Sequence, residues 1–217
     1  AVIAGGGFIG LEVAENLSSQ GIRTTVIDMA PHIMPGFDSE MAEYVENYLA
    51  DNGIMAMTNT RLEGVEGTDA VEKVKTSKRA MKADALVMCL GIRANTEFLK
   101  DIGLEMAPNH TILVDEFLRT NDQDIYAVGD CAMVVNRITG KRAWSPMGSS
   151  ANIEGRIAAQ NLAGATLSYP GVLGTGVVRL PGLNAGRTGL TEAAARDEGH
   201  DVITVLTAVD DKAHYYP

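Results

Sequence analysis

A glycine-rich turn between an apolar strand and a helix constrains the fold of this chain more than any other feature. Residues 1–4 are apolar and suit a buried strand, and Gly5, Gly7 and Gly10 follow in a GxGxxG spacing. Apolar residues then recur at helical spacing until Gly21, which supplies a stop. A β-branched strand comes next and ends in Asp28. This order of strand, turn, helix, strand and acid predicts an α/β fold whose first unit binds a dinucleotide.

Each part of this turn has a physical role in such a unit. Gly5 permits the sharp bend, Gly7 leaves room for the pyrophosphate, and Gly10 lets the helix pack closely on the strand. The helix N-terminus offers free N–H groups and a partial positive charge to the phosphates. Asp28 would accept hydrogen bonds from the adenine-ribose hydroxyls and would repel a 2′-phosphate, and no lysine or arginine follows it at once. The turn therefore favours NADH over NADPH.

A second unit of the same kind begins near residue 112. Residues 112–115 suit a strand, and residues 125–128 predict a short buried strand that ends at Gly129 and Asp130. The glycine lets the backbone approach a ligand, and the carboxylate lies beside it. This pattern predicts a second ligand at the end of a second strand.

The sequence T-x(4)-I-Y-A-x-G-D at residues 120–130 resembles the second flavin-binding motif of the pyridine nucleotide–disulfide oxidoreductases. The resemblance extends over nearly the whole chain, and it points to the coenzyme A-disulfide reductase, NADH oxidase and NADH peroxidase branch. It implies a Rossmann-like NADH domain at residues 1–95, the returning part of an FAD domain at residues 96–168, and the start of an α+β dimerisation domain at residues 169–217. It also implies that Asp130 hydrogen-bonds a ribityl hydroxyl of FAD.

The same resemblance implies further site residues. On the NADH side, Phe8 would cover the nicotinamide site, Glu12 would lie near the nicotinamide, and Gly91 would let the backbone approach that end. Ile9, in the same stretch after the glycines, would also belong to the NAD site. Glu12 also suits simple helix-dipole complementation. On the flavin side the resemblance implies a helix whose N-terminus faces the flavin, preceded or begun by Pro146, Ser149 and Ala151. Ser149 or Ser150 equally suits a helix cap.

Other parts of the family pattern are missing from this sequence. The first FAD motif and the redox-active cysteine that follows it are absent, and neither Cys89 nor Cys131 matches that cysteine. Both cysteines suit reduced, buried, inert thiols. The chain opens in the middle of a strand and closes on Tyr215, Tyr216 and a proline, so we expect a fragment whose redox centre lies upstream. In the branch, the two tyrosines would support the thiol site of a partner subunit; ordinary interface packing is the alternative.

Composition narrows the remaining possibilities. The formal net charge is −10, and no basic cluster suggests a nucleic-acid partner. No apolar run is long enough to span a membrane, and four scattered histidines suggest no metal. We expect a cytoplasmic protein that forms a homodimer when intact.

The predicted function is that of a flavoprotein oxidoreductase. It would pass hydride from NADH to FAD and on to a small-molecule acceptor of the disulfide, persulfide or oxygen type. One alternative is a reductase of a ferredoxin or rubredoxin. The fragment alone is expected to be inactive, and a non-catalytic NAD-binding module is the alternative for it.

The sequence predicts several further elements. Helices are expected at residues 40–49 and 153–162, and a small antiparallel meander at residues 54–84. Residues 85–90 predict a parallel strand buried on both faces, residues 202–206 predict a strong strand, and Thr191 suits a helix N-cap.

Overall fold

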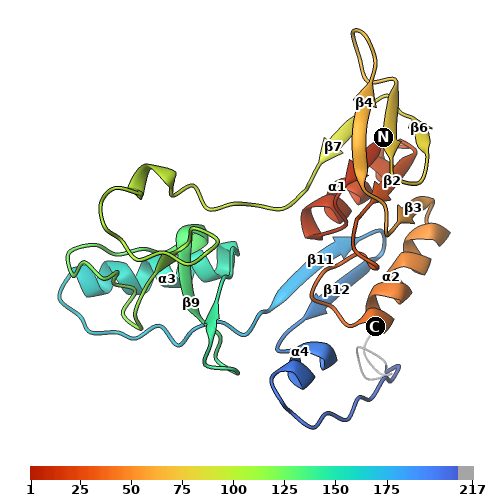
Figure 1. Cartoon of the computed structure of the whole chain (residues 1–217). Coiled ribbons are helices and arrows are strands. Elements are labelled where there is room, and N and C mark those ends of the chain that lie inside the picture. The colour runs from red at the N-terminus through yellow and green to blue at the C-terminus, as the bar shows by residue number, and fades with distance from the viewer. Residues whose placement is uncertain (210–217) are drawn as a thin grey trace.

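The computed structural model describes residues 1–209, which form a larger and a smaller lobe (Figure 1). A four-stranded parallel sheet lies in the larger lobe, and its strands follow the order β3-β2-β1-β7. These strands are β1 (Val2–Ala4), β2 (Thr24–Ile27), β3 (Ile54–Met57) and β7 (Leu86–Met88). The expected α/β class with a parallel sheet is therefore confirmed.

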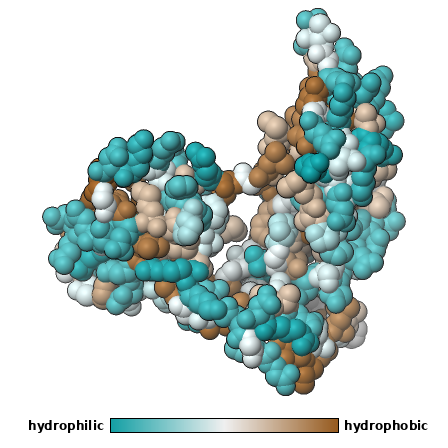
Figure 2. Space-filling model, viewed as in Figure 1, coloured by the Kyte–Doolittle hydropathy of each residue, from teal (hydrophilic) through white to brown (hydrophobic). Residues whose placement is uncertain are grey.

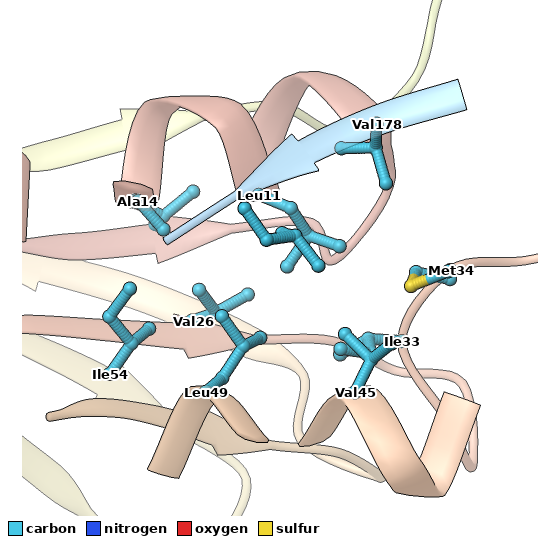
Figure 3. Close-up of a cluster of buried hydrophobic side chains, with 11 residues drawn as sticks. Leu11, Ala14, Val26, Ile33, Met34, Val45, Leu49, Ile54 and Val178 are labelled. Atoms are coloured by element: carbon cyan, nitrogen blue, oxygen red, sulfur yellow. The ribbon is translucent and has the colours of Figure 1, made fainter. Parts of the chain in front are cut away.

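Alternate side chains of the parallel sheet enter two separate cores. On one face, Ile3 and Val26 pack against α1 (Phe8–Ser19) and α2 (Ser39–Asp51), as Figure 3 shows for Leu11, Val26 and Leu49. On the other face, Val2, Ala4 and Ile27 pack against Val74 of an antiparallel meander and against Ala83, which directly follows it. The meander consists of β4 (Leu62–Glu66), β5 (Lys73–Thr76) and β6 (Ala80–Lys82).

A hairpin from the far end of the sequence completes the first core. Strands β11 (Gly176–Leu180) and β12 (Leu183–Arg187) pair antiparallel, and Val178 and Leu180 are buried with Leu11 of α1. Helix α4 (Glu192–Asp197) follows, and the Thr191 hydroxyl accepts a hydrogen bond from the Ala194 N–H at 3.1 Å. The expected N-cap at Thr191 is confirmed.

The smaller lobe holds a separate core between a short sheet and one helix. Its elements are β8 (Ile112–Leu113), β9 (Ala132–Val135), β10 (Arg142–Ala143), α3 (Gly148–Leu162) and the short 3-10 turns η1 (Glu97–Leu99) and η2 (Gly129–Cys131). Ile112, Leu118, Val134 and Ala158 are among its buried side chains. The surface of both lobes is largely hydrophilic, with apolar patches on the side of the larger lobe that faces the smaller one (Figure 2).

Several expected elements differ in the structure. The prediction of a strand at residues 202–206 is wrong, because the described residues offer this segment no neighbouring strand, and Ile203 is 90% exposed. Residues 125–128 form only an isolated bridge between Tyr126 and Arg119. Strand β7 lies at the edge of its sheet and is not buried on both faces, since Met88 is 68% exposed.

The remaining differences are smaller. Helix α3 begins at Gly148 rather than at residue 153, and residues 54–57 belong to the parallel sheet rather than to the meander. Cys89 and Cys131 are half-buried free thiols rather than fully buried ones, and burial raises the pKa of each.

Candidate dinucleotide-binding site

The carboxyl ends of β1, β2 and β7 meet at one cleft of about 430 Å³. Four residues expected on the NADH side line this cleft together, namely Gly5, Gly7, Asp28 and Gly91. They come from segments far apart in the sequence, and the parallel order of the strands brings them to the same edge. Ligands of open α/β sheets bind at this edge of the strands.

The three glycines of the turn differ in what surrounds them. Gly5 has φ +109°, and a Cβ there would overlap the carbonyl oxygen of Cys89. A Cβ on Gly10 would overlap the carbonyl oxygen of Gly5. Gly7 has nothing within 4 Å of its Cβ position among the described residues, and its φ of −78° is open to any residue. The backbone therefore requires glycine at positions 5 and 10, whereas Gly7 only keeps the cleft open.

The N-terminus of α1 is free to bind an anion. Gly7 is its N-cap, and within residues 1–209 no side chain caps the helix and no acidic residue lies in its first turn. The first N–H groups of a helix have no partner inside the helix. Together with the helix dipole they form a site suited to a phosphate.

Asp28 is held in the cleft by two backbone N–H groups. Its Oδ2 accepts a hydrogen bond from the Gly6 N–H at 2.6 Å, and its Oδ1 accepts one from the Ala30 N–H at 2.8 Å. These bonds fix the carboxylate at the end of β2. Each carboxylate oxygen keeps a further lone pair with which it can accept from a ribose hydroxyl.

Phe8, Ile9 and Glu12, which are also expected on the NADH side, are not among the described residues that line the cleft. The Phe8 ring packs edge-on against Phe37, with ring centroids 5.9 Å apart. Ile9 is 60% exposed, and Oε1 of Glu12 accepts from the Arg179 N–H of β11 at 3.5 Å. Sequence reasoning missed Thr60, Arg61 and Leu62, which line the cleft after β3. The signal available was the pairing of β3 with β2, which brings the segment after β3 beside Asp28.

On the flavin side, the structure brings the turn of η2 to the start of α3. Gly129 has φ +74°, and a Cβ on it would lie 3.3 Å from the Cβ of Ala151. The Trp144 Nε1–H donates to the carbonyl of Asp130 at 2.9 Å. Pro146 precedes Met147, the N-cap of α3, and Ser149 lies in the first turn of this helix. No serine side chain in the described part of the chain caps it. The predicted motif and helix N-terminus are therefore neighbours.

Glu154 is the residue of this region that sequence reasoning missed. It is only 1% exposed, and its Oε2 accepts from the Gly129 N–H at 2.6 Å. Burial raises the pKa of Glu154, and burial together with Glu154 raises the pKa of Tyr169 to about 12. An acidic residue next to Ile157 and Ala158 on the inner face of a helix was the available signal. Glu154 holds the turn that presents Asp130.

We expect the Glu154→Gln variant to have a larger free energy of unfolding than the parent protein at pH 7, and so to be more stable. The glutamine oxygen keeps the bond from the Gly129 N–H, while the variant carries no buried charge next to Asp130. Because the folded-state pKa is raised above its ordinary value of 4.5, the parent loses stability as the pH rises through and beyond that value. Urea unfolding from pH 4 to pH 8 measures this difference.

The matched control for this series is Glu43→Gln, which removes an exposed carboxylate from α2. The difference in free energy of unfolding between Glu43→Gln and the parent should not change with pH in the same way. A difference for Glu154→Gln that stays constant across the pH range would contradict the buried-charge explanation.

The sequence also raised the questions of a tyrosine pair, a metal site and a membrane span. Tyr215 and Tyr216 lie outside the described residues. Within residues 1–209, no group of three histidine, cysteine or acidic side chains is placed to hold a metal ion. The same residues contain no helix that is long and apolar enough to cross a membrane.

The parallel sheet, the glycine turn and the acid at the end of β2 define an α/β fold of the class in which dinucleotides bind at the carboxyl ends of the strands. The chain belongs to the pyridine nucleotide-disulphide oxidoreductase family, whose model matches residues 1–155. Its relatives place it in the branch of CoA-dependent sulfur reductases and NADH oxidases. The family is FAD-dependent and uses NAD(P)H.

The comparisons cover the whole chain. The chain is 37% identical over 217 residues to an NAD(P)H sulfur oxidoreductase (CoA-dependent) from Pyrococcus abyssi. This match covers 100% of the chain and 48% of the relative. The structure of an NAD-dependent persulfide reductase from A. fulgidus matches with a TM-score of 0.93 at 37% identity, over 100% of this chain and 40% of that one. A FAD-dependent pyridine nucleotide-disulphide oxidoreductase from Desulfovibrio vulgaris matches with a TM-score of 0.87 at 40% identity, over 93% and 52%. The chain spans about half the length of the curated relatives that it matches.

Proposed function

We propose that this chain binds NADH in the cleft at the end of β1 and β2. Within an intact flavoprotein, it would deliver hydride to FAD for transfer to a disulfide, persulfide or oxygen-type acceptor. The observation that carries the proposal is the meeting of Gly5, Gly7, Asp28 and Gly91 in one cleft beside the free N-terminus of α1. The relatives include a persulfide reductase and a CoA-dependent sulfur oxidoreductase, and their names favour a sulfur acceptor.

The residues of the cleft would divide the nucleotide between them. The N–H groups at the start of α1 would bind the pyrophosphate, and Asp28 would accept from the adenine-ribose hydroxyls. Gly91, two residues after Cys89, would let the backbone come close to the nicotinamide end of the nucleotide. The NADH domain would comprise residues 1–95, and residues 169–217 would begin the domain that joins two subunits in a homodimer.

The smaller lobe fits a flavin in two respects. Gly129 presents Asp130 beside the start of α3, and that helix begins without a side-chain cap in the described part of the chain. Asp130 would accept from a ribityl hydroxyl, and the N-terminus of α3 would favour negative charge on the flavin ring. When bound, FAD supplies the ring that accepts the hydride.

The Asp28→Asn variant tests the NADH site directly. We expect the parent to bind NADH more tightly than NADPH, because the Asp28 carboxylate repels a 2′-phosphate. The variant should lose about tenfold in NADH affinity, since a hydrogen bond to a charged group contributes about 1.5–3 kcal/mol, and the gap between the two nucleotides should narrow. Calorimetric titration of the 217-residue chain with each nucleotide measures both effects.

Asp51→Asn is the matched control, because it removes one negative charge at the exposed end of α2. It should leave both affinities unchanged. If the parent binds neither nucleotide, the proposed site is refuted. Tighter binding of NADPH than of NADH would overturn the assignment of NADH as the favoured nucleotide.

A further inference from the structure

We propose that Arg61 is a specificity-determining residue that attracts the 2′-phosphate of NADPH, so that the cleft accepts both dinucleotides with little discrimination. This inference rests on the proposed nucleotide site and goes beyond it. The sequence around Asp28 contains no adjacent cation, and the cation instead arrives from the segment that follows β3. The proposal therefore depends on the fold rather than on the local motif.

The sheet places Arg61 beside Asp28. Strand β3 pairs with β2, and the segment after β3 continues this contact, since the Thr60 N–H donates to the Asp28 carbonyl at 2.7 Å. Arg61 and Asp28 then line the same cleft. The backbone of Arg61 is fixed as well, because its N–H donates to the Ser77 hydroxyl at 3.0 Å. Arg61 thus lies at the end of the cleft where an adenine ribose would meet Asp28.

The guanidinium of Arg61 can exchange its carboxylate partner for a phosphate. Its present partner is Glu63, whose Oε1 lies 3.1 Å from the Arg61 Nη2, and both side chains are largely exposed, at 65% and 44%. An exposed ion pair of this kind contributes little to stability. A guanidinium binds phosphate oxygens through two parallel N–H donors, which a single carboxylate contact does not match. A 2′-phosphate can therefore displace Glu63.

A second cation lies at the same end of the sheet. The ammonium of Lys78 donates to the carbonyl of Thr58 at 2.8 Å, two residues before Thr60. Two positive side chains thus flank the segment that follows β3, in a chain whose formal net charge is −10. The positive charges of Arg61 and Lys78 at this end of the cleft would attract an additional phosphate.

The hydrogen bonds that Asp28 accepts weaken its repulsion of a 2′-phosphate. Both of its oxygens already accept from backbone N–H groups, those of Gly6 and Ala30. These donors partly offset the negative charge that a 2′-phosphate would meet. Repulsion by Asp28 and attraction by Arg61 then act on the same group, and the discrimination between the two nucleotides becomes small.

The experiment titrates the 217-residue chain with NADH and with NADPH. We expect the parent to bind NADH more tightly than NADPH, but by less than about tenfold, because Arg61 offsets part of the repulsion by Asp28. Arg61→Ala should weaken the affinity for NADPH by about tenfold and change the affinity for NADH by less than about twofold. This is the effect expected when a charge-assisted contact to a phosphate is lost. Glu63→Gln should strengthen NADPH by about threefold, because it releases the guanidinium from its exposed pair.

Arg23→Ala is the control, since it removes the same charge just before β2, at the opposite end of that strand from Asp28. It should leave the ratio of the two affinities unchanged. Equal losses for NADH and NADPH in Arg61→Ala would place the guanidinium on the adenine ring or the pyrophosphate and would overturn the proposal. Unchanged NADPH affinity in that variant would overturn it as well. Failure of the parent to bind NADH would instead refute the nucleotide site itself.

Discussion

An alanine at Gly10 is expected to destabilise the larger lobe by about 3 kcal/mol, because its Cβ has no room. The methyl group would overlap the carbonyl oxygen of Gly5, which is backbone and not the end of a flexible side chain. Gly5 cannot move aside, since it lies against the Cys89 carbonyl and its N–H donates to the Ile27 carbonyl at 2.8 Å. Urea unfolding followed by circular dichroism measures the loss.

The control is a second helical glycine that has space around it. Gly155 lies inside α3, and nothing in the described residues comes within 4 Å of its Cβ position. Gly155→Ala should leave stability unchanged or raise it by up to about 1 kcal/mol, the difference in helix propensity. An unfolding midpoint for Gly10→Ala equal to that of the parent would contradict the close approach of α1 to β1.

The Gly7→Ala variant should have the opposite character, with normal stability and impaired binding. Its added methyl group meets no described atom within 4 Å and requires no unusual backbone angle. The same methyl group would stand in the open cleft where the pyrophosphate approaches the N–H groups of α1. Losing a hydrogen bond to a charged group costs about 1.5–3 kcal/mol, so NADH affinity should fall at least about tenfold.

Thermal unfolding and calorimetric titration of the same Gly7→Ala sample separate these two effects. Gly155→Ala serves again as the control, and it should bind NADH like the parent. A Gly7→Ala protein that binds NADH normally would show that the pyrophosphate lies elsewhere. A lowered melting temperature would show that Gly7 has a structural role as well.

The sequence predicted those parts of the site that a local motif determines. Gly5 and Gly7 lie in one turn and Asp28 ends the next strand, so their meeting in the cleft follows from a single βαβ unit. Gly10, in the first turn of α1, belongs to the same local motif. Arg61 and Glu154 were missed because they reach their sites through packing between distant segments. Arg61 depends on the pairing of β3 with β2, and Glu154 depends on the contact of α3 with η2.

The incorrect strand prediction has a related cause. Residues 202–206 have a strong β propensity, but a strand also needs a neighbour, and the described residues supply none for this segment. The resemblance assigns Phe8 and Glu12 to the nicotinamide end, and the structure adds that both lie against β11 of the hairpin. No pattern within the sequence of α1 reveals that a hairpin more than a hundred residues later will cover it.

Val178 lies beside Leu11 of α1 (Figure 3), and Leu180 is buried in the same core. Their burial also affects the order in which the parts of the chain can fold during synthesis. The first helix emerges early, but the strand that covers Leu11 is synthesised only after the whole smaller lobe. The core of the smaller lobe, from Ile112 to Val172, is continuous in sequence and is complete before Val178 appears. Domains generally fold as units during synthesis. The core that α1 and α2 share with the β11–β12 hairpin is therefore the last of the three described cores to close.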